Sequence, residues 1–190
     1  MLDTLVAPGP DVLTEPIVAW RTWTLLGSRD GDQVRLHPLF GRRQAWPPRY
    51  PARASCSRRG RHAVPGLDCT CGWYAMHDHE GLRRSRDPAV LGTVALWGRI
   101  VEHRFGFRAE FAYPQRLRLV CFLCLWSSGA GGVRGCTVVV PRHGGRLVPL
   151  CEPHLDLCRR YGYPIRRLLG APEVEQTLLS TYAVDVLRTV

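Results

Sequence analysis

The sequence predicts an α+β fold in which an antiparallel sheet, or a half-open barrel, is joined to a small Cys/His module and a C-terminal helix. Three observations predict it. Residues 17–26 and 107–113 are rich in β-branched, aromatic or alternating apolar side chains, as strands are. Cysteines and a histidine recur at metal-ligand spacing within 121–154. An apolar stripe with a four-residue period predicts a helix over 171–189.

The first strand is expected to belong to a hairpin. Residues 17–26 and 34–39 flank Asp30-Gly31-Asp32, a turn signal. A short helix is expected over 78–86, with Asp78 as its cap.

Two further strands are expected in the middle of the chain. The apolar run 90–101 predicts a buried strand. Residues 107–113 alternate apolar and polar side chains, so this strand is expected to have one wet face, which carries Arg108 and Glu110. Pro114 is expected to end it.

Four zinc-ligand residues have informative spacing in the second half of the chain. Cys121-x2-Cys124 is followed, after 26 residues, by Cys151-x2-His154. Three thiolates and one imidazole form a common tetrahedral zinc site. The sequence therefore predicts that these four residues bind zinc.

The segment between the two ligand pairs supports a zinc finger. Residues 137–140 and 146–148 read as strands around a turn at 143–145, and a helix is expected from Cys151 to Gly162. This order resembles a treble-clef finger. The resemblance implies a knuckle turn for the first ligand pair and a helix start for the second.

A second candidate metal site precedes this module. Its cysteines are Cys56, Cys69 and Cys71. His62 lies between them and would complete a four-ligand set, while His77 and His79 are alternative fourth ligands. The structural alternative is that these thiols are small buried side chains that bind no metal.

A catalytic interpretation also has residues to support it. The tetrapeptide from His77 to Glu80 contains metal-binding residue types, and His103 follows Glu102 in an expected turn. A zinc ion with three protein ligands and a water molecule would be hydrolytic. A solvated polar turn is the ordinary alternative for both segments.

The charge of the chain predicts an anionic partner. All 26 basic residues are arginine, and the net charge is +10. No acidic residue occurs in 33–67 or in 111–151. Such a positive field attracts nucleic acid or an acidic protein, although coding bias in a GC-rich genome also enriches arginine. The expected nucleic-acid contacts are Arg42, Arg43, Arg58, Arg59 and Arg61. Trp46, in the same basic region, is the tryptophan expected to be most exposed, where it could stack on a base, although packing in the core or a loop is the favoured alternative to stacking.

Several classes of protein are not predicted. The first twenty residues lack the pattern of a secretory signal, and no apolar run is long enough to span a membrane. Eight cysteines in a chain of this kind favour metal binding over disulfides, and a cytoplasmic location is expected. No P-loop or nucleophile-elbow motif is present.

Three segments resemble an uncharacterised family of actinobacterial and phage or plasmid-borne proteins. They are Cys69–Ala75 (Cys-x-Cys-Gly-x-Tyr-Ala), Trp97–His103 (Trp-Gly-x-Val-x-x-His, with Ile in place of Val) and Gly106–Glu110. The resemblance covers about residues 12–155. It implies a histidine ligand between the first cysteines, which favours His62, and it implies no mechanism.

The expected organisation has four parts: an irregular arm (1–15), a β-rich domain with the first Cys/His cluster (16–116), a zinc-finger module (117–163) and a C-terminal helix (164–190). The expected function is non-catalytic zinc binding, with a basic face that contacts nucleic acid or another polyanion. The alternatives are a zinc-dependent hydrolytic enzyme and an interaction adaptor encoded by a mobile element.

Overall fold

The computed structural model describes residues 4–6, 15–39, 44–57, 62–85, 87–129 and 132–188, and within them it confirms the mixed fold class. Eleven strands belong to one connected sheet. The strands are β1 (Thr4–Val6), β2 (Ile17–Gly27), β3 (Val34–His37), β4 (Ala52–Arg53), β5 (Trp73–Met76), β6 (Val90–His103), β7 (Gly106–Leu119), β8 (Val138–Pro141), β9 (Arg146–Leu150), β10 (Leu169–Gly170) and β11 (Asp185–Val186). The helices are α1 (Phe122–Ser128), α2 (Glu152–Arg160) and α3 (Ala171–Tyr182), with 3-10 turns at Glu80–Arg84 and His143–Gly145.

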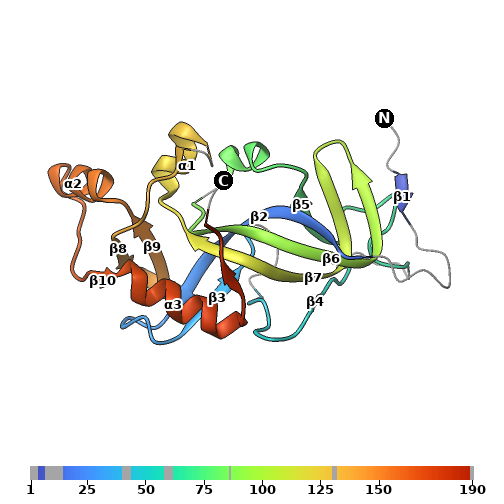
Figure 1. The fold of residues 1–190 in the computed structure, drawn as a ribbon, viewed down its shortest axis with the longest axis horizontal. Coiled ribbons are helices and arrows are strands. Elements are labelled where there is room, and N and C mark those ends of the chain that lie inside the picture. The colour runs from blue at the N-terminus through green and yellow to red at the C-terminus, as the bar shows by residue number, and fades with distance from the viewer. Residues whose placement is uncertain are drawn as a thin grey trace.

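Three long strands form the centre of the sheet. β6 and β7 make an antiparallel hairpin, and β2 pairs antiparallel with β6 (Figure 1). The predicted hairpin around Asp30–Asp32 is present as β2 and β3. β1 pairs with β6, so Thr4–Val6 is a strand within the segment predicted to be an irregular arm. The pairing of β2 with β9 makes the β8–β9 hairpin part of the same sheet.

Two bulges shape the β6–β7 hairpin. Gly98 has a φ of 75°, and the register shifts between Trp97 and Ile100. The second shift lies between Thr93 and Val94, opposite Pro114. β7 therefore continues past Pro114 to Leu119, and the prediction that this proline ends the strand is wrong. A bulge interrupts the regular ladder of hydrogen bonds between the two strands. Proline, which has no backbone N–H to donate, is therefore tolerated beside one.

Four strands form an incompletely closed ring. β2 pairs with β6, β6 with β7, and β7 with β5. β5 then meets β2 at a single residue pair, Trp20–Met76. The ring is consequently open along most of the β2–β5 seam, and the sheet is not a closed barrel.

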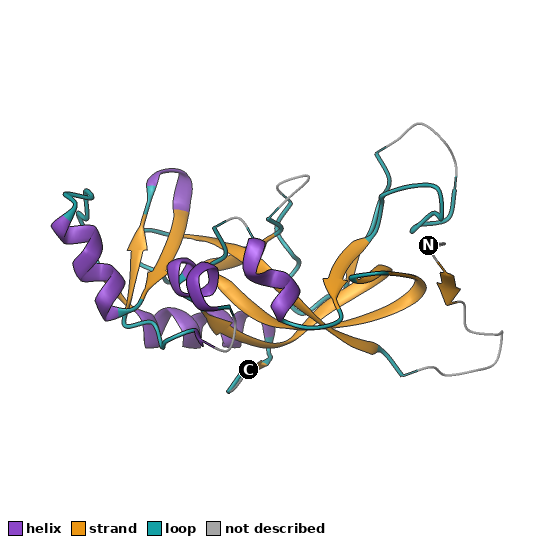
Figure 2. Ribbon diagram, turned by 90° about the horizontal axis from the view of Figure 1, so that it is seen from above, coloured by secondary structure: helices purple, strands orange, loops and turns teal. Residues whose placement is uncertain are grey.

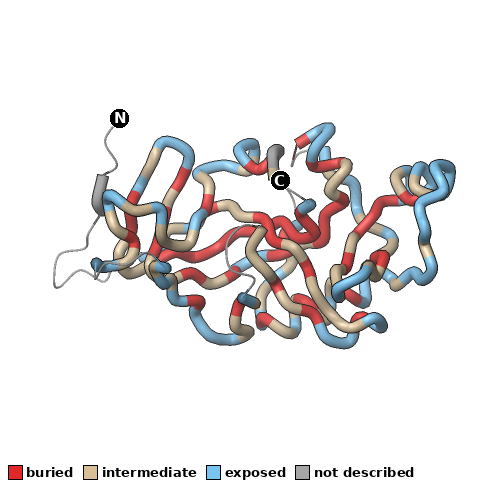
Figure 3. The backbone as a smooth tube through the Cα atoms, turned by 180° about the vertical axis from the view of Figure 1, so that it is seen from behind, coloured by how far each residue is buried: buried red, intermediate tan, exposed pale blue. Residues whose placement is uncertain are grey.

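Both faces of the central strands are covered, and buried residues follow these strands (Figures 2 and 3). α3 packs on one face through Val174, Leu178 and Tyr182. Leu82, from the Glu80–Arg84 turn, and Leu125 of α1 pack on the other face. None of the described helices is long and apolar enough to cross a membrane.

The C-terminal helix is shorter than the predicted 171–189. α3 ends at Tyr182, and Ala183 has the left-handed φ of 52°. Asp185–Val186 then forms β11, which lies parallel to β7. The apolar period typical of a helix continues in the sequence beyond Tyr182. Pairing with β7 nevertheless makes the backbone extended there, because tertiary contacts override helix propensity.

Trp46 is buried in the core rather than exposed, so that expectation is wrong. Its exposed fraction is 1%, and its ring meets Trp23 edge-on at 5.5 Å. The Tyr182 hydroxyl donates to the carbonyl oxygen of Trp46 and accepts from the N–H of Leu36, at 2.9 Å each. Tyr182 thereby links α3, β3 and the loop at Trp46.

We predict that Tyr182→Phe lowers the free energy of unfolding by about 1–3 kcal/mol, because a buried carbonyl and a buried N–H lose their partner. Urea denaturation measures the effect. Tyr161→Phe is the matched control, since Tyr161 is 78% exposed and should change stability little. Equal stabilities for the two variants would contradict the bridging role of Tyr182.

Candidate metal centres

The module in the second half of the chain brings four ligand residues together. Cys121, Cys124, Cys151 and His154 present ligand atoms that all lie within 4.8 Å of one another. Two of these residues come from the start of α1 and two from the start of α2, with the β8–β9 hairpin between the helices in the chain (Figure 1). The ligand spacing in the sequence thus corresponds to one site in space.

The distances within this cluster fit one metal ion. Cys124 Sγ lies 3.5 Å from Cys151 Sγ. His154 Nδ1 lies 3.2–3.4 Å from the three sulfurs. Sulfurs bound to one tetrahedral zinc ion are about 3.8 Å apart, whereas a disulfide bond is about 2.05 Å. All eight cysteines lie in the described residues, and none forms a disulfide.

Both ligand pairs use the same local geometry. Cys121 is the N-cap of α1 and Cys151 is the N-cap of α2, each with extended φ and ψ. Cys124 and His154 therefore occupy the N3 position of their helices. The side chains of N-cap and N3 meet above the first turn, as they do in a capping box. The first pair is at a helix start, so the knuckle turn that the treble-clef resemblance implied is not what the structure has.

The environment of this cluster is apolar. Cys121, Cys124 and Cys151 are buried and make up half of the six-residue core of the module, which also contains Val140, Leu150 and Leu155. Burial raises the pKa of Cys121 to about 12. A bound metal ion would lower that pKa again, because it binds the thiolate form of the cysteine. The positive ends of the helix dipoles at the two helix N-termini favour the same form.

The first cluster is also assembled. Cys56, His62, Cys69 and Cys71 present ligand atoms within 4.8 Å of one another. Cys56 Sγ lies 3.6 Å from Cys69 Sγ and 3.3 Å from His62 Nε2. His62 is exposed and the cysteines are half-buried, so solvent reaches this site more easily than the second one.

The structure places His62, rather than His77 or His79, with the three cysteines. His62 Nδ1 lies 2.8 Å from the carbonyl oxygen of Ala63. A hydrogen bond from Nδ1–H to a backbone carbonyl is the usual way to fix a ligand histidine with its other nitrogen free. His77 Nε2 instead lies 3.2 Å from the carbonyl oxygen of His103, and His79 packs against Trp20.

Arg108 has a role that the sequence pattern missed. The alternation in β7 placed it on a wet face, yet its exposed fraction is 4%. Its Nη1 donates to the carbonyl oxygens of Gly66, Cys69 and Cys71, at 3.1 Å and 3.4 Å for the first and last. The loop that carries the cysteine ligands covers this face of β7, which no alternation within the strand can indicate.

Arg99 supports the same loop from β6. Its Nε donates to the carbonyl oxygen of Pro65 at 2.9 Å. A zinc ion with three thiolates and one neutral imidazole carries a net charge of −1, so nearby guanidinium groups stabilise the loaded site. Arg99 and Arg108 thus both donate to backbone carbonyl oxygens of this loop. A contact between a side chain and a distant backbone group leaves no pattern in the sequence, so these roles could not be predicted from it.

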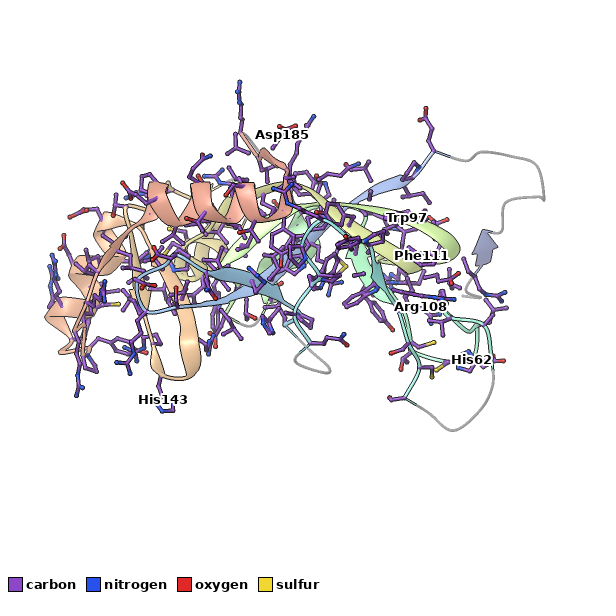
Figure 4. All side chains as sticks on the ribbon, turned by 90° about the horizontal axis from the view of Figure 1, so that it is seen from below. His62, Trp97, Arg108, Phe111, His143 and Asp185 are labelled. Carbon is purple, nitrogen blue, oxygen red and sulfur yellow. The ribbon has the colours of Figure 1, made fainter. Side chains whose placement is uncertain are left out.

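The two clusters lie toward opposite ends of the long axis. The second is at the end with α2, whereas His62 is at the opposite end, beyond the β6–β7 hairpin (Figures 1 and 4). Cys136 and Cys158 belong to neither cluster; both are half-buried and pack against the core of the module. Among the described residues, the ligand atoms of His77, His79 and His103 form no third cluster.

The expected nucleic-acid contacts lie outside the described residues. They are Arg42, Arg43, Arg58, Arg59 and Arg61. Comparison with known proteins finds no match to a family model, a curated protein or a solved structure. The resemblance to the actinobacterial and phage family stays a prediction.

We predict that Cys124→Ala halves the zinc content of the purified protein from two ions per chain to one. A structural zinc site contributes about 10–16 kcal/mol of apparent binding energy, so the melting temperature should fall by well over about 10 °C. Elemental analysis and thermal denaturation measure the two effects. Cys158→Ala is the control, because Cys158 lies outside both clusters and should leave two ions bound. An excess of chelator should destabilise the wild type in the same way.

We predict that Arg108→Met weakens zinc binding at the first cluster about 10–100-fold, as the loss of supporting hydrogen bonds does at other metal sites. Competition with a chromogenic chelator measures it, and one of two zinc equivalents should be released earlier than in the wild type. Arg116→Met, an exposed position on β7, is the matched control. Release of both equivalents together would argue against a local role for Arg108.

Proposed function

We propose that this chain is a non-catalytic zinc-binding protein whose basic surface contacts nucleic acid. The observation that supports zinc is the convergence of three thiols and one imidazole in each of two clusters. This ligand set favours zinc among the common metals. Four protein ligands leave no coordination position for a water molecule, which favours a structural role over a hydrolytic one.

We also propose that the protein works in the reducing cytoplasm. Eight free cysteines, six of them in the two clusters, suit a compartment in which thiols stay reduced. Oxidation would compete with metal binding for the same sulfurs.

The charge distribution supports a polyanionic partner. The acid-free stretch 111–151 extends from β7 through α1 to the end of β9, and Arg116 and Arg134 within it are exposed. An excess charge of +10 favours association with the phosphate backbone at low salt.

We predict that the zinc-loaded protein binds labelled oligonucleotides with a dissociation constant that rises at least about tenfold between 50 and 200 mM salt, because phosphate binding releases counterions. Fluorescence anisotropy measures it for single-stranded DNA, single-stranded RNA and duplex DNA. The proposal is wrong if none of the three is bound at 50 mM salt.

A protein-interaction adaptor is a second candidate, and one observation favours it. Three large aromatic residues of the second-cluster module are exposed: Trp126 (73%), Tyr161 (78%) and Tyr163 (54%). Exposed aromatic side chains are enriched where proteins bind one another. If Trp126→Ala leaves the affinity for nucleic acid unchanged, this aromatic surface is distinct from the surface that binds nucleic acid.

A further inference from the structure

A groove with a volume of about 660 Å³ follows the open seam of the strand ring. It is lined by residues of β2, including Trp20 and Arg21, and by all four residues of β5. The first metal cluster contributes its three cysteines to the lining. The volume is within the range of ordinary ligand pockets, about 300–1,000 Å³. The groove exists because β5 pairs with β2 at one residue pair only.

Aromatic side chains line this groove, and two of them are open to solvent. Phe105, in the turn between β6 and β7, is 62% exposed, and Tyr74 of β5 is 41% exposed. The ring of His103 lies 5.9 Å from that of Tyr74 and also lines the groove. Exposed flat rings beside a groove are suited to stack on unpaired bases.

Two arginines, Arg21 and Arg53, line the groove in the described part of the chain, and no aspartate or glutamate does. The first cluster, whose three cysteines also line the groove, would carry a net charge of −1 when loaded with zinc, so the positive charge of the groove lies at the two arginines. The Arg21 guanidinium lies 5.2 Å from the ring centre of Trp46 and 5.6 Å from that of Trp73, and its Nη1 donates to the carbonyl oxygen of Tyr74 across the seam. Burial lowers the pKa of Arg21 to about 10, so it keeps its charge at neutral pH.

Arg53 is available to an incoming anion. Its side chain is 73% exposed, and it forms an ion pair with Glu110, whose side chain is 24% exposed, at an N–O distance of 3.2 Å. A guanidinium group has five N–H donors, so Arg53 can bind a phosphate group while it keeps its contact with Glu110. A guanidinium group also binds phosphate through two parallel hydrogen bonds.

We propose that this groove is the binding site for single-stranded nucleic acid, with a base stacked on Phe105 and Tyr74 and a phosphate held by Arg53. The site rests on the proposed function, which it deepens by naming the surface and the form of nucleic acid. Arg21 contributes a fixed positive charge beneath the bound strand. A duplex keeps its bases stacked internally, and an acidic peptide offers charge without a flat face, so neither uses both features of the groove.

The test measures affinity for a labelled single-stranded oligonucleotide of about ten nucleotides by fluorescence anisotropy. Phe105→Ala should weaken binding about tenfold, in keeping with the loss of one stacked base. Arg53→Gln should weaken it about 3–10-fold and reduce the slope of log affinity against log salt by about 0.7, the value for one phosphate on a single strand. Both variants should keep two zinc ions per chain.

Matched controls lie outside the residues that line the groove. Trp126→Ala removes an aromatic side chain that is more exposed than Phe105, and Arg159→Gln removes an arginine in an exposed ion pair, at 3.5 Å from Asp156. Neither should change affinity. An oligonucleotide with abasic positions should bind the wild type weakly, and Phe105→Ala should then make little further difference.

Each contrary result has a distinct meaning. Wild-type affinity in both groove variants, with salt-dependent binding intact, overturns the groove site and leaves the proposed function standing. A further outcome is that polyglutamate displaces the labelled oligonucleotide as effectively as unlabelled oligonucleotide does. That result would show that the groove binds an acidic peptide, and it would also overturn the proposed site. Failure of the wild type to bind any nucleic acid overturns the site together with the proposed function.

Discussion

The convergence of three thiols and an imidazole at the starts of two helices is the constraint on which the second half of the structure depends. α1 and α2 have seven and nine residues, too few to be stable alone in water. The core between them has six residues, and three of these are the cysteines themselves. Three apolar side chains, those of Val140, Leu150 and Leu155, complete this small core. A shared metal ion would add coordinate bonds to it and would fix both helix starts against the β8–β9 hairpin.

The first cluster solves a different problem, that of holding an exposed loop. Its cysteines are half-buried and its histidine is exposed, so apolar burial contributes little to the conformation of residues 62–71. Two kinds of contact replace it. The ligands connect the two sides of the loop, and Arg108 and Arg99 donate to carbonyl oxygens along it from the neighbouring strands. With zinc bound, the negative charge of the site and the positive charge of Arg108 would stabilise each other, which would give the buried arginine a role beyond its hydrogen bonds.

The second ligand set was predictable because its information is local, whereas the fourth ligand of the first cluster was left open among His62, His77 and His79 until the structure placed His62 with the cysteines. A two-residue gap between ligands suits a helix start, and the hairpin between the pairs has its own strand and turn signals. Arg108 and Trp46 were placed wrongly because their burial depends on segments distant in sequence: the loop near Cys69 covers one, and Tyr182 anchors the other. The prediction that Pro114 ends its strand failed for a related reason, because the bulge that accommodates this proline arises from pairing with β6. Periodicity reports the faces of a strand but not what covers them.

The position of the groove follows from the lengths of the strands. β2 has 11 residues and β7 has 14, but β5, which must connect them, has four. A strand that short can satisfy its pairing with β7 and still reach β2 only at Met76. The Arg21 side chain bridges the remaining gap by donating to the Tyr74 carbonyl oxygen, and it brings its positive charge to the seam. Lengthening β5 would close the ring and remove the groove together. The fold therefore places charge, aromatic rings and open backbone at one site, next to the first metal cluster, as a direct consequence of leaving its ring of strands incomplete.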